Sequence, residues 1–290
     1  MTLKNLKVSI IVCTHNGALT ISQCLSSLKK QNYPSQKYEV IVIDNASTDN
    51  TKRLIKNVQY VYEAKLGLSI ARNRGIKQAK GEIVAFIDDD ALADKNWLKH
   101  LVSQFKTKKI WAVGGQVKPK YQVKPPNWLP KKYLFALSIC HLGSTIKSVP
   151  DIIGTNMAFR KTIFSQIGYF NPRLGRRANK LFSSEEIDLC QRITKANGKI
   201  IYTPHAIVRH LVSKQRLTKR FFTLRIFFEG VSLARMDKEN INFNKRFRRL
   251  IFHRSRALIT ALIKLLIYRR FTYWCDFLLN LGYFSGFFPA

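Results

Sequence analysis

Three consecutive aspartates, Asp88, Asp89 and Asp90, are the residues of this sequence that point most clearly to chemistry. They follow an apolar run typical of a buried strand, and three adjacent carboxylates repel one another unless a cation joins them. In an extended backbone, residues two apart point the same way, so Asp88 and Asp90 can face one site. Oxygen ligands suit Mg²⁺ or Mn²⁺, and Mg²⁺ is usually held by one or two carboxylates together with substrate phosphates. A solvated acidic turn or a helix cap is the alternative, but the strongly basic chain around the triplet favours a metal site.

Polar residues also follow two other predicted strands. Thr14 and Asn16 come after the apolar run at 8–13, and Asp44 comes directly after the run at 39–43. Near-continuous apolar strands that alternate with helical patterns predict a doubly wound α/β fold with a mostly parallel sheet. Ligands of such sheets bind beyond the carboxyl ends of the strands. The three polar clusters are therefore expected at one edge of the sheet.

The elements that position these clusters are predicted from the same alternation. We expect strands at 8–13, 39–43, 58–62, 83–87 and 111–114, and crossover helices at 22–30, 49–57 and 69–80. Residues 118–150 contain several prolines and lose the periodicity, which predicts an irregular segment or lid. Regular structure is expected again at 151–160, followed by a helix at 185–196 that Gly198 closes and a strand at 199–203.

The order of these motifs resembles the family 2 glycosyltransferases, which have the GT-A fold. The resemblance is carried by Val8 to Asn16, Val42 to Asp49, Gly67 to Gly75, Gly81 to Asp90, Gly154 to Arg160 and Glu185 to Leu189. It runs in order over roughly residues 6–212, and the order and spacing are far more specific than any single motif. It implies a Rossmann-like sheet with flanking helices in a catalytic domain at 1–212. Residues 1–115 would form its nucleotide-binding half and 116–212 its acceptor-binding half.

The resemblance also implies roles for individual residues and a Mn²⁺ or Mg²⁺ cofactor. Residues implied in nucleotide-sugar binding are Thr14, Asn16, Asp44, Arg72, Asp89, Gly154 and Asn156. Residues implied in metal binding are Asp88 and Asp90, which form the Asp-x-Asp motif, and His210. The alternative for Asp44 is an Asx turn, and the alternative for Arg72 is a solvated helix face. The alternative for His210 is a structural role, since a lone histidine is more often structural than a metal ligand.

A general base is the next requirement, because an acceptor hydroxyl attacks an anomeric carbon more readily when a carboxylate takes its proton. The resemblance places this base at residues 185–188, where many relatives have Glu-Asp. We favour Glu186, with Glu185 second and Asp188 third. A capping box that begins at Ser183 or Ser184 is an alternative explanation for one of these carboxylates. One base and one direct displacement imply inversion at the anomeric carbon.

The composition limits the kinds of partner and the compartment expected for this protein. The chain has 290 residues with 50 Lys and Arg against 17 Asp and Glu, a formal net charge of +33. Such a charge attracts nucleic acid, anionic lipid headgroups or phosphorylated substrates. The five cysteines are scattered and form no CxxC pair, which favours a reducing compartment. The apolar run near the N-terminus is too short for a signal peptide, so we expect a cytoplasmic location.

The tail at 213–290 is basic and rich in aromatic residues. From residue 211 onward it has 16 Lys and Arg against 4 Asp and Glu, which gives about +12. The apolar runs at 257–267 and 271–290 are too interrupted to span a bilayer cleanly. We expect basic amphipathic helices that lie on the inner face of the membrane, close to lipid-linked or other glycan acceptors. Packing on the catalytic domain, or a membrane hairpin, are the alternatives.

The leading hypothesis is transfer of a sugar from a nucleotide diphosphate donor to an acceptor hydroxyl, in the synthesis of cell-surface glycans or exopolysaccharide. A non-enzymatic nucleic-acid or polyanion binder is the rival, suggested by the charge and the interleaved aromatics. Against it, the charge is spread along the chain, and the aspartate triplet repels phosphate without a metal. Nucleic acid is therefore not the expected partner. A nucleotidyltransferase, which also uses a nucleotide and a metal, is a second alternative.

Overall fold

The computed structural model describes residues 6–177, 180–240 and 245–288, which form two compact units. The first, here called the sheet unit, comprises 1–120, 138–172 and 185–211. The second, here called the helical unit, comprises 121–137, 173–184 and 212–290. Two segments that precede residue 212 in the sequence thus group with the C-terminal helices.

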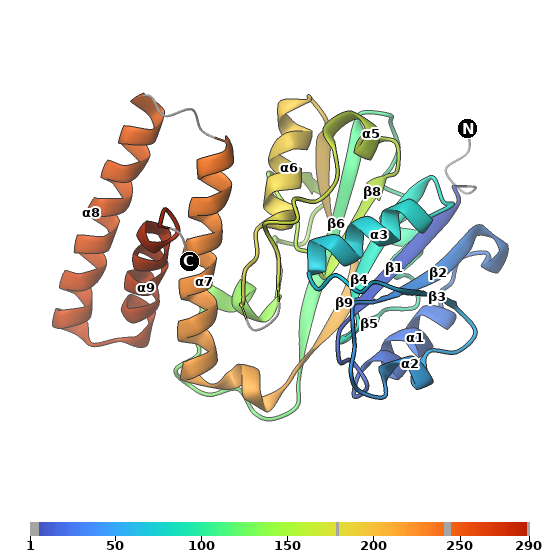
Figure 1. Ribbon diagram of the computed structural model, residues 1–290, viewed down its shortest axis with the longest axis horizontal. Coiled ribbons are helices and arrows are strands. Elements are labelled where there is room, and N and C mark those ends of the chain that lie inside the picture. Colours follow the sequence, from blue (N-terminus) through green and yellow to red (C-terminus); the bar gives the residue numbers. More distant parts are fainter. Residues whose placement is uncertain (1–5, 178–179, 241–244, 289–290) are drawn as a thin grey trace. The chain divides into compact units, whose positions relative to one another are not determined.

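One half of the sheet is parallel. Its strands lie in the order β3-β2-β1-β4 (Figure 1). They are β1 (Val8–Thr14), β2 (Tyr38–Asp44), β3 (Gln59–Tyr62) and β4 (Ile83–Asp88). The register places Thr14 beside Asp44 and Cys13 beside Asp88, so the polar residues that end these strands meet at one edge, as predicted.

The other half of the sheet contains antiparallel pairs. Its strands are β8 (Asn156–Arg160), β6 (Ile110–Tyr121), β9 (Lys199–Val212) and β5 (Ala91–Ala93) in spatial order, and β7 (Lys147–Ser148) pairs with β9. Because β8 is antiparallel to both β4 and β6, β6 runs in the same direction as β4. The strand predicted at 111–114 therefore has the predicted direction, but β8 separates it from the parallel half.

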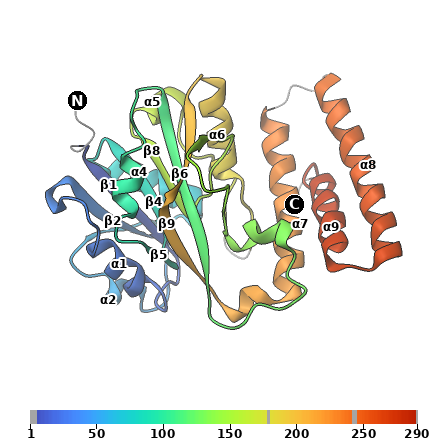
Figure 2. The same ribbon diagram turned by 180° about the vertical axis from the view of Figure 1, so that it is seen from behind.

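Both faces of the sheet are covered, because alternate residues of each strand face opposite sides. In β1, Ile10 and Val12 belong to one buried cluster, with α1 (Ile21–Lys29) and α4 (Trp97–Val102). Ile11 belongs to the opposite cluster, which includes residues of three further helices. These are α3 (Leu68–Gln78), α5 (Ile163–Ile167) and α6 (Glu185–Lys195), and Figure 2 shows the sheet and its helices from behind.

Several predicted boundaries differ from the structure. The helix predicted at 49–57 is the single turn α2 (Thr51–Leu54), and Asn57 beyond it has a positive φ of 59° that a helix does not accommodate. The strand predicted at 199–203 extends to Val212. Short 3₁₀ turns occupy η2 (Ser35–Lys37), η3 (Lys131–Leu137) and η4 (Lys214–Leu217).

Three helices form most of the helical unit, which is compatible with the predicted helical tail. They are α7 (Lys219–Asn240), α8 (Lys245–Tyr268) and α9 (Phe271–Ser285), and α9 packs against both of the others (Figure 1). The backbones of α7 and α9 approach closely at Gly230 and Gly282. A Cβ atom at Gly230 would lie 2.0 Å from the carbonyl oxygen of Leu279, so only glycine fits there. No helix in the described part of the chain is long and apolar enough to cross a membrane.

Candidate functional site

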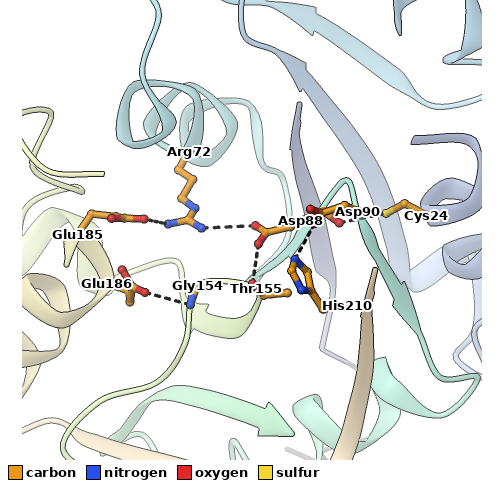
Figure 3. A network of polar contacts seen from close by, with 9 residues as sticks. All are labelled: Cys24, Arg72, Asp88, Asp90, Gly154, Thr155, Glu185, Glu186 and His210. Carbon is orange, nitrogen blue, oxygen red and sulfur yellow. Dashed lines mark hydrogen bonds and ion pairs between the residues drawn. The ribbon is translucent and has the colours of Figure 1, made fainter. Parts of the chain in front are cut away.

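Asp88 is the last residue of β4 and makes two polar contacts at the sheet edge. Its Oδ2 accepts a hydrogen bond from the Thr155 hydroxyl at 2.6 Å. Its Oδ1 lies 3.7 Å from Nη2 of Arg72, which α3 carries (Figure 3). Asp88 is thus fixed from two sides while its side chain keeps about a third of its surface exposed.

The two aspartates that follow turn toward different neighbours. The Thr14 hydroxyl at the end of β1 donates to Asp89. A Cβ atom at Gly17 would lie 2.2 Å from oxygens of both Thr14 and Asp89, so glycine is required for this contact. Nε2 of His210 lies 3.2 Å from Oδ1 of Asp90.

The histidine contact follows from the pairing of β5 with β9. Ala91 lies opposite His210 in this ladder, and the Leu211 N–H donates to the Asp90 carbonyl at 2.8 Å. The imidazole is buried. The strand pairing therefore places a histidine beside the third aspartate, and a stretch of 119 intervening residues separates the two in the sequence.

Arg72 connects the aspartates to the start of α6. Its Nη1 donates to Oε1 of Glu185 at 2.6 Å, and the two side chains are 3 % and 5 % exposed. Burial opposes the charge of Arg72, but the carboxylates of Glu185, Asp88 and Glu186 outweigh it and raise the arginine pKa, which keeps the guanidinium charged. The solvated helix face considered for Arg72 is therefore wrong.

Gly154 lies directly against this guanidinium. A Cβ atom at Gly154 would lie 2.7 Å from Nη2 of Arg72. The Gly154 N–H also donates to Oε1 of Glu186 at 3.4 Å (Figure 3). The backbone at Gly154 is thus in contact with the arginine on one side and with a glutamate of α6 on the other.

The three carboxylates predicted as possible bases have different surroundings. Glu185 is buried against Arg72, and its Oε2 has no hydrogen-bond partner within the described residues. Asp188 accepts two hydrogen bonds from Arg192 one turn along α6, at 2.7 and 3.0 Å. Glu186 is half-buried: its Oε1 accepts a long hydrogen bond from the Gly154 N–H at 3.4 Å, and its Oε2 is buried.

The capping box considered for this helix does not form. The Ser183 hydroxyl donates to Glu229 at 2.7 Å, and the Ser184 hydroxyl has no partner within the described residues. Ser184 also has a positive φ of 71°, a strained conformation for a residue with a side chain. The left-handed backbone at Ser184 and the ion pair between Glu185 and Arg72 fix the start of α6.

Asp44 and Asn16 shape the loops beyond β1 and β2. Asp44 is buried, accepting from the Ser47 N–H at 3.0 Å and from the Tyr60 hydroxyl at 2.9 Å. The bond from Ser47 comes from three residues on rather than the two of an Asx turn, and it closes the loop after β2. Burial and the bond to Asp44 raise the pKa of Tyr60 to about 12, so its hydroxyl remains a donor. Asn16 accepts from the Thr48 N–H at 2.8 Å and so ties the two loops together.

Asn156 has a structural environment. It is fully buried and donates to the carbonyls of Gln116 at 3.0 Å and Ala206 at 2.8 Å. Its Oδ1 accepts from the Trp97 indole at 2.8 Å. All of these bonds point into the protein, so its side chain has no surface left for a sugar.

The structure thus brings most of the predicted residues into one connected set at the sheet edge. They are Thr14, Arg72, Asp88, Asp89, Asp90, Gly154, Glu185, Glu186 and His210. Asp188 and Asn156 are engaged elsewhere. Sequence reasoning assigned no role to Thr155, although it stands next to Gly154 in the quoted motif, or to Tyr60, whose partner lies across a strand pair.

Similarity to known proteins shows the family of this chain. The sequence model of glycosyl transferase family 2 matches residues 9–168, more than half of the chain. The chain belongs to glycosyltransferase family 2. It is 26 % identical over 245 residues to the glucosyl-dolichyl phosphate glucuronosyltransferase of Haloferax volcanii, covering 80 % of this chain and 78 % of that one. It is 25 % identical to the O-antigen chain rhamnosyltransferase WbaN of Salmonella anatum, covering 92 % of this chain and 89 % of that one.

A solved structure shares the fold of this glycosyltransferase. The mannosyltransferase PcManGT from Pyrobaculum calidifontis, in complex with GDP-Man and Mn²⁺, superposes with a TM-score of 0.66 at 20 % identity. The match covers 97 % of this chain and 86 % of the other. The predicted GT-A fold is confirmed. The activity is sugar transfer from a nucleotide-sugar donor, and neither the polyanion binder nor the nucleotidyltransferase is supported.

Proposed function

We propose that this glycosyltransferase is a metal-dependent, inverting enzyme whose base is Glu186 and whose acceptor is a lipid-linked glycan. The observation that carries the assignment of the base is the difference among the three carboxylates at the start of α6. Glu185 and Asp188 are each held by an arginine, at 2.6 and 2.7 Å. Glu186 is the more exposed of the three, and a base must reach its substrate.

Asp88 and Asp90 would hold a Mg²⁺ or Mn²⁺ ion. Within the described ranges, no three His, Cys, Asp or Glu side chains are grouped so that they could hold a metal ion by themselves, as a complete protein cage would. Such a cage is not required, because Mg²⁺ is commonly bound by one or two carboxylates, with water and substrate phosphates at the other positions. The donor set fits: two carboxylates stand two residues apart in a partly exposed turn, with an imidazole beside the second. When bound, the ion supplies positive charge that neutralises the departing diphosphate.

Arg72 would contribute the second positive charge at this edge. Its guanidinium is permanently charged and lies between Asp88 and Glu185. The bond to Glu185 fixes the plane of the guanidinium, and contact with Gly154 limits its movement on another side. Arg72 would therefore act from behind the aspartates as a fixed positive charge that favours a donor diphosphate at this edge.

The proposed reaction needs one proton transfer and one displacement. Glu186 accepts the proton of the acceptor hydroxyl as its oxygen bonds to the anomeric carbon. The bond from that carbon to the diphosphate breaks at the same time, and the nucleoside diphosphate leaves with the electron pair. Attack opposite the leaving group inverts the anomeric configuration.

The acceptor and the location are proposed from the relatives and from the tail. The name of the Haloferax relative contains a dolichyl phosphate, a lipid carrier. Helix α8 is strongly basic, and the chain carries +33 overall. These features support a peripheral position at the cytoplasmic face of the membrane, where a lipid-linked acceptor is accessible.

The base is tested by two isosteric variants assayed for glycosyl transfer and for donor binding. Glu186→Gln is expected to lower the transfer rate about 10²–10⁴-fold while leaving donor affinity within a few-fold. Asp188→Asn is the matched control on the same helix, and its transfer rate should stay within about tenfold of wild type. A folded Glu186→Gln enzyme with the wild-type rate, or a larger loss in Asp188→Asn, contradicts the assignment.

A further inference from the structure

Helix α8 of the helical unit has two apolar faces, of which one is packed. Ala261 is buried, Leu258 and Leu265 are half-buried, and the helix contacts α9. On the same face the Arg254 guanidinium lies 4.4 Å from the ring centre of Tyr283. This face explains how α8 is held on α9.

The second apolar face of α8 is exposed. It comprises Phe252, Ile259, Leu262, Ile263, Leu266 and Ile267, here called the α8 outer face, whose exposed fractions run from 42 % to 68 %. The spacing of three, four and seven residues places them in one stripe along the helix. A row of large apolar side chains in solvent marks an interaction site, because monomeric proteins rarely leave such a patch uncovered.

The charge around the α8 outer face identifies the kind of partner. Between Glu239 and Asp276 the sequence has no acidic residue and nine basic ones. They are Lys245, Arg246, Arg248, Arg249, Arg254, Arg256, Lys264, Arg269 and Arg270. An apolar stripe with only basic charges along the helix matches the interface of an anionic bilayer, where acyl chains lie below phosphate headgroups.

We propose that the α8 outer face docks on an anionic lipid membrane, with the helix lying along the surface and its six apolar side chains below the headgroups. A second copy of the chain is a poorer occupant, since face-to-face pairing of two α8 helices would bring their basic residues together. The inference rests on the proposed membrane-side acceptor and adds the surface that binds the lipid. It does not depend on the catalytic residues.

Vesicle flotation of the full-length protein tests this assignment. The probes are phosphatidylcholine vesicles with and without phosphatidylglycerol. Wild type should float with the anionic vesicles and less with the neutral ones. Leu266→Glu, at the position 68 % exposed, should weaken the anionic partition coefficient by about tenfold or more. Leu54→Glu on α2 adds the same charge at another exposed leucine and should bind as wild type does.

Two further measurements distinguish loss of membrane binding from misfolding and from loss of catalysis. Leu266→Ala adds no charge and should weaken binding by about threefold or more, so it separates loss of the apolar contact from any effect of the added charge on folding. Nucleoside diphosphate release without vesicles should be equal in wild type and Leu266→Glu. A wild-type protein that releases no nucleoside diphosphate would contradict the proposed function and would leave the membrane proposal to be decided by flotation. Wild type that fails to float, Leu266→Glu that floats as well as Leu54→Glu, or a dimer that Leu266→Glu dissociates without affecting flotation, each overturns the proposal.

Discussion

Glu185 and Glu186, neighbours at the start of α6, have different surroundings. Glu185 is buried against Arg72, whereas Glu186 is half-buried and contacts the backbone of Gly154. Adjacent residues of a helix point about 100° apart, so Glu185 can support the arginine while Glu186 points elsewhere and is the proposed base. The sequence favours Glu186 as the base but cannot reveal the pairing of Glu185 with Arg72, because Arg72 lies more than a hundred residues away.

Gly154→Ala tests whether the position of Arg72 matters for the donor. The new Cβ would lie 2.7 Å from Nη2, so the guanidinium must shift although no charged group is lost. We expect the KM for the nucleotide sugar to rise about tenfold, as measured by initial rates. In an Arg72→Ala background the same change should have little further effect, since the arginine it displaces is absent. Additive effects in this double-mutant cycle would show that Gly154 acts independently of Arg72.

At the scale of elements, the parallel half of the sheet is predictable because each strand carries its own signal. Strands buried on both faces are short continuous apolar runs, and four of the predicted runs are β1 to β4. The place of β8 between β4 and β6 is a property of long-range pairing, which no local pattern encodes. The short β5, whose ladder brings His210 to Asp90, was missed for the same reason.

The role of Asn156 illustrates the same limit at the candidate site. The resemblance implied a sugar contact, because the residue lies in a motif next to Gly154. In the structure its hydrogen bonds join residues of α4, β6 and β9. Burial of this kind is decided by three segments far apart in the sequence, so the motif alone could not reveal it.

Asn156→Ala should therefore reduce stability more than donor binding. It leaves the Trp97 indole and two carbonyls without their partner, which costs about 2–4 kcal/mol of the free energy of unfolding. Urea denaturation measures this loss. Asn32→Ala is the matched control, because its side chain bonds Asn96 at the surface, and should cost below about 1 kcal/mol. Unchanged stability with a raised donor KM would instead support a sugar contact.

For the molecule as a whole, three of the five cysteines are buried and two, Cys13 and Cys140, are half-buried. Burial raises the pKa of Cys13 to about 12, of Cys140 to about 11 and of Cys275 to about 12. It raises the pKa of Cys24 and Cys190 well above the ordinary value too. Because a raised pKa keeps each thiol protonated, none of the five is a ready nucleophile near neutral pH.

Alkylation at pH 8 tests this directly. We expect each of these five thiols to react with iodoacetamide at least about 10²-fold more slowly in the native protein than in urea, since the thiolate fraction falls about tenfold for each unit of raised pKa. Mass spectrometry of the alkylated peptides gives the rate at each site. A cysteine that reacts equally fast in both states would contradict the burial of that thiol.

The net charge of +33 matches the charge of the ligands expected for the whole molecule. In a family 2 glycosyltransferase the anionic ligands are a nucleotide diphosphate donor and, as proposed, a membrane surface. The acidic turn at residues 88–90 is the local exception in a basic chain. A divalent cation there would convert a repulsive site into one that accepts a diphosphate.

The most direct test of this account is nucleoside diphosphate release from a panel of nucleotide sugars, with Mn²⁺, with Mg²⁺ and with EDTA. We predict release from one nucleotide class only when a divalent cation is present. Asp88→Asn, which keeps the shape of the side chain, should lower that release at least about 10²-fold. Equal release in EDTA, or from a folded Asp88→Asn protein, would contradict a metal-assisted donor site at the aspartate turn.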